Sequence, residues 1–233
     1  MKVTIHQPTY WPWLGLLDKI SKSELFVILD SVNVSKGSFQ YRNKFLCQNN
    51  SKFITMPVNV KSNTKFIDLT FKNDNWRNHQ LEFIRNYYNK SRYYETIFPL
   101  VKSAYVDFSG ESANDFIIHT MKKSLEWFGI KVKIIQSSEL NIIASKGELV
   151  HKICNSLNAS TYISGIGAKE YMTDSDYLNF KKSKINIDWQ SFKHPVYNQS
   201  NNTNEFIDGL SCLDMLFHEG LNKCSKVFID KNI

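Results

Sequence analysis

Cysteine is scarce in this 233-residue chain, and the four cysteines, Cys47, Cys154, Cys212 and Cys224, are widely spaced. No two of them form a Cys-x-x-Cys pair, and none has a histidine at the spacing of zinc ligands. A His-x-x-x-His zinc helix is absent as well. We therefore expect no metal site, and we expect the cysteines to be free thiols in a reducing compartment.

Long hydrophobic runs are also missing. No apolar stretch approaches the roughly 20 residues that cross a bilayer. The apolar run at the N-terminus is interrupted at His6 and is too short for the core of a signal peptide. We therefore expect a cytoplasmic protein without membrane insertion. Hydrophobic residues make up 42% of the chain and charged residues 22%, which is ordinary for a globular protein with a substantial core.

The charge is unbalanced, with 29 Lys and Arg against 22 Asp and Glu and a formal net charge of +7. A positive surface favours anionic partners such as nucleotides, sugar nucleotides or nucleic acid. The basic residues are dispersed, and no block of them marks a nucleic-acid-binding arm. The charge alone therefore does not identify a ligand.

Strand-like and helix-like patterns alternate along the chain, without internal repeats or low-complexity linkers. This alternation predicts an α/β fold with a mainly parallel sheet flanked by helices, in which residues 2–7 and 25–29 are neighbouring strands. Further strands are predicted at 53–60, 66–71, 132–135, 161–163 and 185–189, and helices at 76–88, 98–105, 112–128, 148–157 and 211–219. We expect one domain over 1–233. Whether residues near 50–110 form an inserted or flanking lobe is left open.

The most informative segment is the loop that follows the first predicted strand. It begins with His6, Gln7 and Pro8 and continues through Tyr10 to Trp13. Proline stiffens the backbone and the aromatic rings offer a large contact area, so the loop is suited to a small ligand at the carboxyl end of a strand. A packed N-terminal hairpin that closes the core is the alternative.

Three further loops combine polar and aromatic residues. Residues 35–44 offer Lys36 and Arg42 for phosphate, and a solvated basic loop is the alternative. Ser164-Gly165-Ile166-Gly167 allows backbone amides to approach a phosphate, although it matches neither the Rossmann nor the Walker A pattern and a structural turn explains it equally well. Residues 194–199 repeat the mixture of the N-terminal loop. We expect all four loops to meet at one crevice, with His6 and then His194 as candidate general bases.

The order of these motifs resembles the WbqC-like protein family over nearly the full chain. The resemblance rests on His-Gln-Pro-x-Tyr-x-Pro-Trp-x-Gly at the N-terminus, Ser-x-x-x-Arg-Asn-Lys, Ser137-Ser138, Tyr-x-Ser-Gly-x-Gly-x-x-x-Tyr, Pro-x-Tyr-x-Gln and Ser211-x-x-Asp214. The family pattern falls on His6, Gln7, Pro8, Tyr10, Pro12, Trp13, Gly15, Asp30, Lys36, Ser38, Gln40, Arg42, Asn43, Ser164, Gly165, Gly167, Tyr171, Tyr197, Gln199 and Asp214. Asn33, Phe39 and Tyr41 depart from it, and these changes bear on the identity of the substrate.

The genetic setting of this family implies a role in O-antigen and other surface polysaccharides of bacteria. The resemblance thus implies a transferase that attaches an acyl or aminoacyl group, such as glycyl, to the amine of an amino-sugar nucleotide. In this interpretation the substrate-binding residues are Gln7, Tyr10, Trp13, Lys36, Ser38, Gln40, Arg42, Asn43, Ser164, Gly165, Gly167, Tyr171, Tyr197 and Gln199. Two alternatives stay open: a transferase that uses aminoacyl-tRNA, and a non-catalytic sugar-nucleotide-binding or assembly protein.

The opening strand, loop and helix also resemble the layout of nucleotidyltransferase-like domains. In those domains a His-containing loop after the first strand and a later Ser- or Gly-rich loop hold ATP phosphates. Here His6 and Ser164-Gly165 would take these two places. The analogy suggests that ATP activates a carboxylate, which an amine then captures, although a shared fold does not fix a function.

Overall fold

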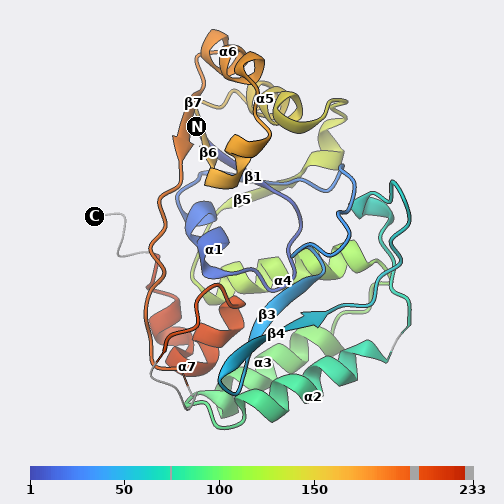
Figure 1. Ribbon diagram of the computed structural model, residues 1–233, viewed down its shortest axis with the longest axis vertical. Coiled ribbons are helices and arrows are strands. Elements are labelled where there is room, and N and C mark those ends of the chain that lie inside the picture. The colour runs from blue at the N-terminus through green and yellow to red at the C-terminus, as the bar shows by residue number, and fades with distance from the viewer. Residues whose placement is uncertain (74, 200–204, 229–233) are drawn as a thin grey trace.

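The computed structural model describes residues 1–73, 75–199 and 205–228. It contains a five-stranded sheet, a separate two-stranded hairpin, and helices around both (Figure 1). The sheet strands are β1 (Lys2–His6), β2 (Leu25–Ile28), β5 (Lys133–Gln136), β6 (Thr161–Ser164) and β7 (Asn186–Trp189), and the hairpin strands are β3 (Arg42–Cys47) and β4 (Asn50–Thr55). The α-helices are α1 (Leu14–Ser21), α2 (Trp76–Tyr88), α3 (Tyr94–Val106), α4 (Ala113–Trp127), α5 (Lys146–Ser156), α6 (Asp174–Lys182) and α7 (Cys212–Cys224), and the 3₁₀ turns are η1 (Phe66–Asp68), η2 (Ser137–Leu140) and η3 (Ile166–Glu170).

The sheet has the strand order β5-β2-β1-β6-β7, and all neighbouring strands are parallel. Val3 lies opposite Leu25, which confirms the predicted pairing of the first two strands. In chain order the strands are arranged third, second, first, fourth, fifth, as in doubly wound sheets. β1 and β6 therefore flank the point where the strand order reverses. Ligands of such sheets bind there, at the carboxyl ends of the strands.

Alternate residues of β2 face two different cores. Phe26 and Ile28 pack into one core with α1 and α4, whereas Leu25 and Val27 pack into a second core with α5 and α6. Helices therefore cover both faces of the sheet, as Figure 1 shows, and a strand buried on both faces is apolar throughout. The predicted α/β fold, with a parallel sheet flanked by helices, is confirmed.

The connection between β2 and β5, residues 29–132, is the longest excursion from the sheet. It carries the β3–β4 hairpin, η1 and helices α2, α3 and α4, much of it in the lower half of Figure 1 with α7. Its apolar side chains join those of α1 in one hydrophobic core. The single domain over 1–233 and the lobe near 50–110 stay predictions. Within the described residues, no helix is long and apolar enough to span a membrane.

Three predictions in this connection were wrong in whole or in part. Residues 66–71 do not form a strand, because Phe66 and Leu69 are both buried at a spacing of three and the amide of Leu69 donates to the carbonyl of Phe66. The predicted strand 53–60 ends at Thr55, shortly before Pro57, which has no N–H for a ladder. Residues 42–47 form β3 rather than part of a polar loop.

Candidate functional site

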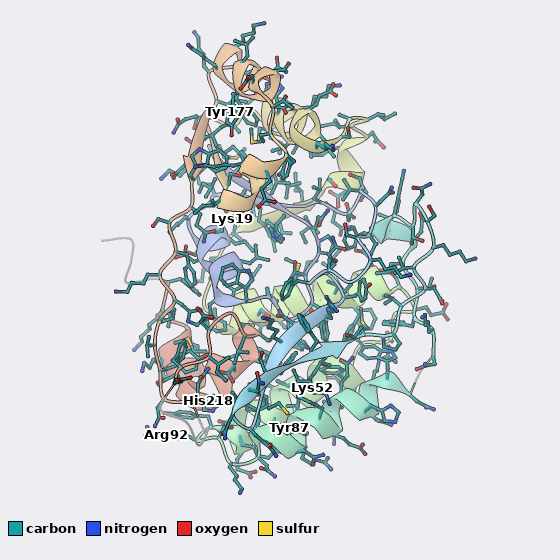
Figure 2. The ribbon with its side chains drawn as sticks, in the orientation of Figure 1. Lys19, Lys52, Tyr87, Arg92, Tyr177 and His218 are labelled. Carbon is teal, nitrogen blue, oxygen red and sulfur yellow. The ribbon has the colours of Figure 1, made fainter. Side chains whose placement is uncertain are left out.

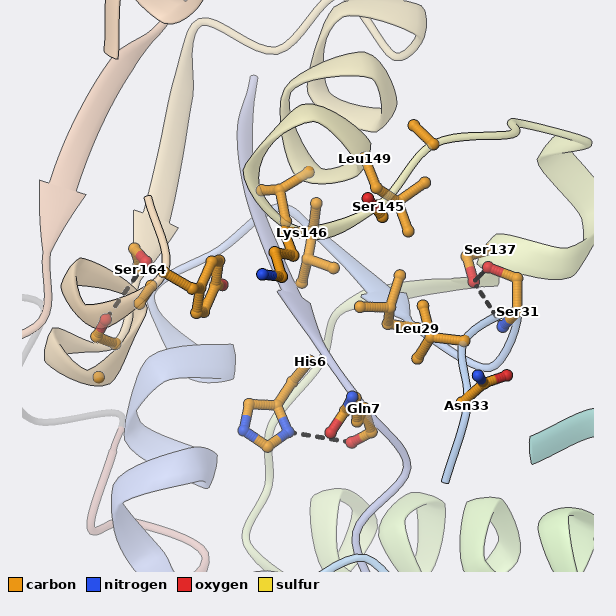
Figure 3. Close-up of a pocket in the computed structure, with 18 of the residues that line it drawn as sticks. His6, Gln7, Leu29, Ser31, Asn33, Ser137, Ser145, Lys146, Leu149 and Ser164 are labelled. Carbon is orange, nitrogen blue, oxygen red and sulfur yellow. Dashed lines mark hydrogen bonds between the residues drawn. The ribbon is translucent and has the colours of Figure 1, made fainter. Parts of the chain in front are cut away.

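A cavity of about 1270 Å³ opens at the carboxyl ends of β1 and β6. Its walls come from the segments after β1, β2, β5 and β6, from one face of α1 and from the first turn of α5 (Figure 3). It therefore occupies the ligand-binding position of a doubly wound sheet. The polar side chains that line it are His6, Gln7, Lys19, Ser31, Asn33, Ser35, Lys65, Ser137, Ser138, Asn141, Ser145, Lys146, Tyr162, Ser164, Tyr171 and Gln190.

The charges of the cavity have one sign. Lys19, Lys65 and Lys146 line it together with His6, and no Asp or Glu is among the described residues of its wall. Figure 3 shows the side-chain nitrogen of Lys146 directed into the space between His6 and Ser164. A concave surface with basic groups and no carboxylate concentrates anions.

His6 ends β1 and lines the cavity. Its Nδ1 lies 2.9 Å from the carbonyl oxygen of Gln7, which assigns the proton to Nδ1 and leaves Nε2 as the hydrogen-bond acceptor of the ring. Burial, followed by the charge of Lys19, lowers the pKa of His6 to about 3. The imidazole is therefore neutral at physiological pH.

Lys19 lines the same cavity from α1. Its side chain is buried, and its Nζ donates to the carbonyl oxygen of Ile5 at 3.0 Å. Burial lowers the pKa of Lys19 to about 7, because the interior disfavours the charged ammonium. The cavity thus contains an amine that titrates near neutral pH beside a neutral imidazole.

Asp30 holds the part of the cavity wall that follows β5. It is fully buried just after β2 and accepts hydrogen bonds from the side chains of Gln136, Ser137 and Ser138 and from the backbone amide of Ser138. The hydroxyl of Ser137 also contacts that of Ser31 at 2.8 Å. Because its carboxylate is occupied by these donors, Asp30 fixes the position of the serines that line the cavity rather than neutralising its lysines.

At Gly165 and Gly167, which follow β6, the packing of the protein leaves room for a side chain. A Cβ on Gly165 or on Gly167 would meet no atom within 4 Å, and neither residue has a positive φ. Both nevertheless line the cavity. Side chains at these positions would therefore occupy space that is open to a ligand rather than collide with the protein.

Comparison with known proteins bears on the family. The sequence model of the WbqC-like protein family matches residues 7–226. The chain belongs to the WbqC-like family. It is also 23% identical over 222 residues to the uncharacterized protein Rv1507c of Mycobacterium tuberculosis, a match that covers 94% of each chain. No solved structure matches the chain.

Two of the four predicted loops of this WbqC-like chain meet at the cavity. His6, Gln7 and Trp13 line it from the first loop, and Ser164, Gly165, Gly167 and Tyr171 line it from the loop after β6. Tyr10, by contrast, is buried among aromatic side chains, and its hydroxyl pairs with Gln80 and Tyr105. The crevice predicted between His6 and Ser164 is therefore present, and Tyr10 lies outside it.

The basic loop of the WbqC-like chain, residues 35–44, lines the cavity with one residue only. Ser35 lines the cavity, whereas Lys36, Ser38, Gln40, Arg42 and Asn43 do not. Gln40 pairs with the side chain of Gln7 and accepts from the amide of Ser35, and Asn43 donates to the carbonyls of Tyr10 and Trp11. These amides hold the first loop in place. Arg42 packs over the ring of Phe53 at 4.2 Å, and Lys36 is exposed.

The loop at 194–199 does not reach the cavity, so the prediction that all four loops converge is wrong for this loop. Tyr197 and Gln199 donate to Asp214, at 2.7 and 2.9 Å, in a buried network that also includes Tyr88. His194 contacts the carbonyl of its neighbour Pro195 at 2.8 Å and lies against Phe206. The ring of Tyr197 lies near that of His218. Figure 2 shows His218 in the lower half of the molecule, away from Lys19 of the cavity.

Lys19, Lys146 and Gln190 were not predicted as site residues. Lys19 follows Leu14, Leu16 and Leu17 in a helix whose residues from Leu14 to Ile20 are all buried. A lysine within such an apolar pattern was a signal that sequence reasoning could have used. Lys146 and Gln190 carry no such signal, because only the strand order brings them to β1. Within the described chain, no group of three or more His, Cys, Asp or Glu could hold a metal ion.

Proposed function

We propose that this protein is a transferase that attaches an acyl or aminoacyl group, such as glycyl, to the amine of an amino sugar linked to a nucleotide. The family to which the chain belongs supports a place in the synthesis of O-antigen or another surface polysaccharide. The observation that carries the proposal is the wall of the cavity, which has three lysines and no carboxylate among the described residues. The diphosphate of a nucleotide sugar supplies the negative charge that this wall lacks.

The size and the lining of the cavity suit two reactants. About 1270 Å³ exceeds the roughly 300–1,000 Å³ of a usual small-molecule site, so an acyl donor has room beside the sugar nucleotide. Trp13 and Tyr171 are partly exposed at its wall and can cover a sugar or base ring. Serine, asparagine and glutamine side chains offer hydrogen bonds to sugar hydroxyls.

In the proposed reaction the sugar amine attacks the carbonyl carbon of the activated acyl group. The C–N bond forms, the activating group leaves with its electron pair, and the nitrogen loses a proton. Nε2 of His6 accepts a hydrogen bond from the amine and then this proton. A base with a pKa of about 3 is weak, because burial disfavours the charged imidazolium. The negative charge of a bound diphosphate favours the imidazolium and so strengthens the base.

The acyl donor is proposed by analogy with nucleotidyltransferase-like domains. In that layout ATP reacts with a carboxylate, pyrophosphate leaves, and the acyl-adenylate then reacts with the amine and releases AMP. In this analogy His6, at the end of β1, and Gly165, just after the adjacent strand β6, would hold the phosphates, and both line the cavity. We propose that the reaction takes place in the cytoplasm.

Incubation with UDP- and dTDP-linked amino sugars and candidate donors, followed by mass spectrometry, tests the function. The donors are glycine with ATP, acyl thioesters and aminoacyl-tRNA. The proposal predicts a sugar nucleotide that gains the acyl mass through an amide. If a product forms only with aminoacyl-tRNA, the acyl donor is aminoacyl-tRNA and the proposed ATP step is wrong. Tight binding of the sugar nucleotide without a product for any donor would favour a non-catalytic protein.

His6→Ala tests the role of the imidazole in the same assay. We expect this variant to bind the sugar nucleotide and to lose at least about 100-fold in turnover rate. Asp188→Asn, an exposed change on β7, is the matched control and should leave turnover unaltered. Turnover at the wild-type rate by His6→Ala would remove His6 as the base.

A further inference from the structure

Lys19 is a buried amine that has no carboxylate partner among the described residues. It is 4% exposed, and its one hydrogen bond in the described structure goes to the carbonyl oxygen of Ile5. No carboxylate of the described residues forms an ion pair with it. Buried charges in proteins are almost always paired, so the protonated form of this amine is expected to have an external anionic partner.

The groups around Lys19 do not supply negative charge. His6, Lys65, Lys146, Tyr162 and Tyr171 are the titratable side chains that line the cavity with it. Asp18, which precedes Lys19 in the sequence, and Asp30, which follows the adjacent strand β2, are already engaged. Asp18 pairs with Lys22 at 2.8 Å and accepts from Gln190, and Asp30 is surrounded by its serine and glutamine donors.

Lys19 also lies at the place where a phosphate would bind. Its Nζ is held against the last residues of β1, beside His6, and the cavity that it lines continues to Gly165 and Gly167 after β6. At the two glycines the ligand can approach the backbone, because no side chain fills the space.

We propose that Lys19 is the innermost anion-binding group of the cavity and pairs with the diphosphate of the nucleotide sugar between the ends of β1 and β6. This inference rests on the proposed function, since it names the protein group that receives the charged part of that substrate.

The pairing has a measurable signature. Burial lowers the pKa of Lys19 to about 7, so roughly nine-tenths of this amine is neutral at pH 8 in the free protein. A diphosphate beside it restores the ammonium form, because an opposite charge favours the charged state. Binding should therefore take up close to one proton at pH 8. His6 contributes little there, since its pKa of about 3 lies far below this pH.

Calorimetric titration at pH 8 in buffers of different ionisation enthalpy measures this uptake. The probes are UDP-N-acetylglucosamine and dTDP-glucose, whose diphosphates do not themselves titrate near pH 8. For the wild type we expect an uptake of about 0.5–1 proton. Lys19→Met should lose at least about tenfold in affinity and take up no proton on binding. Lys19→Arg keeps its charge at this pH, so it should bind more tightly than Lys19→Met and also take up no proton.

Lys146→Met is the matched control, because it removes a lysine that lines the same cavity from α5, away from the contact of Lys19 with Ile5. It should weaken binding and leave the proton uptake intact. Circular dichroism of each variant excludes unfolding as the cause of a loss. Binding by the wild type without uptake, with Lys19→Met unchanged in affinity, would overturn the inference and leave the proposed function standing.

Acetate serves as a third probe and separates a carboxylate from a phosphate. A proton uptake that depends on Lys19 with acetate but not with the nucleotide sugars would assign Lys19 to the acyl donor and contradict the diphosphate assignment. Failure of every nucleotide sugar to bind the wild type would contradict both the inference and the function on which it rests.

Discussion

At the scale of single residues, the hydrogen-bond partners of a polar side chain separate binding roles from structural ones. His6 and Lys19 each contact a nearby backbone carbonyl and line a cavity open to a ligand. Tyr197 and Gln199 instead direct their donors to the fully buried Asp214. All four are polar residues beside apolar ones in the sequence. The local sequence therefore does not separate the two roles, whereas the hydrogen-bond partners do.

Tyr197→Phe tests the structural role of that hydroxyl. The change removes one of the donors to a buried carboxylate, so we expect the free energy of unfolding to fall by about 1–3 kcal/mol, measured by urea denaturation. The affinity for a nucleotide sugar should stay the same, because Tyr197 lies outside the wall of the cavity. Tyr177→Phe, an exposed tyrosine on α6, is the control. An unchanged stability with a weaker affinity would restore the binding role predicted from the sequence.

At the scale of elements, the strands of the sheet could be predicted because each is a short segment with an apolar or an alternating apolar pattern. β3 was missed for a physical reason. Asn43 is buried in it, and its amide donates to the carbonyls of Tyr10 and Trp11, more than 30 residues away in the sequence. A local pattern does not reveal such a distant partner, so the segment resembles a polar loop. The same limit explains why the four candidate loops could be found but not which of them meet.

The loop after β6 makes a prediction at this scale. Gly165→Ala should change the free energy of unfolding by less than about 0.5 kcal/mol, since the new methyl group has no neighbour within 4 Å. The affinity for a nucleotide sugar should fall, and Gly165→Val should lower it further, because the side chain occupies ligand space. Gly147→Ala provides the contrast. Its Cβ would lie 2.4 Å from the carboxyl group of Asp176, so it should destabilise the fold by about 1–3 kcal/mol. A Gly165 variant that binds as the wild type does would separate this loop from the site.

At the scale of the whole molecule, stability should depend on pH through Lys19. The folded pKa of about 7 lies below the ordinary value of 10.5, so between these values the unfolded chain binds more protons than the folded one. The free energy of unfolding attributable to Lys19 therefore rises with pH from about 7 upward, by at most about 1.4 kcal/mol per pH unit.

Urea denaturation of the wild type and Lys19→Met between pH 6 and 9.5 isolates this contribution. The difference between the two proteins cancels the titration of the other groups, including the buried tyrosines and cysteines. We expect the wild type to gain stability relative to Lys19→Met as the pH rises through 7. A difference that stays constant over this range would show that Lys19 keeps its charge in the folded protein.

The proposed function and the role of Lys19 both require that the cavity between the ends of β1 and β6 bind the diphosphate of a nucleotide-linked amino sugar. A crystal structure with such a ligand shows directly where the diphosphate lies. We expect phosphate oxygens within hydrogen-bond distance of Nζ of Lys19 and next to Gly165, with the sugar inside the same cavity. A diphosphate bound instead to Lys36 and Arg42, with the cavity empty, would contradict both proposals.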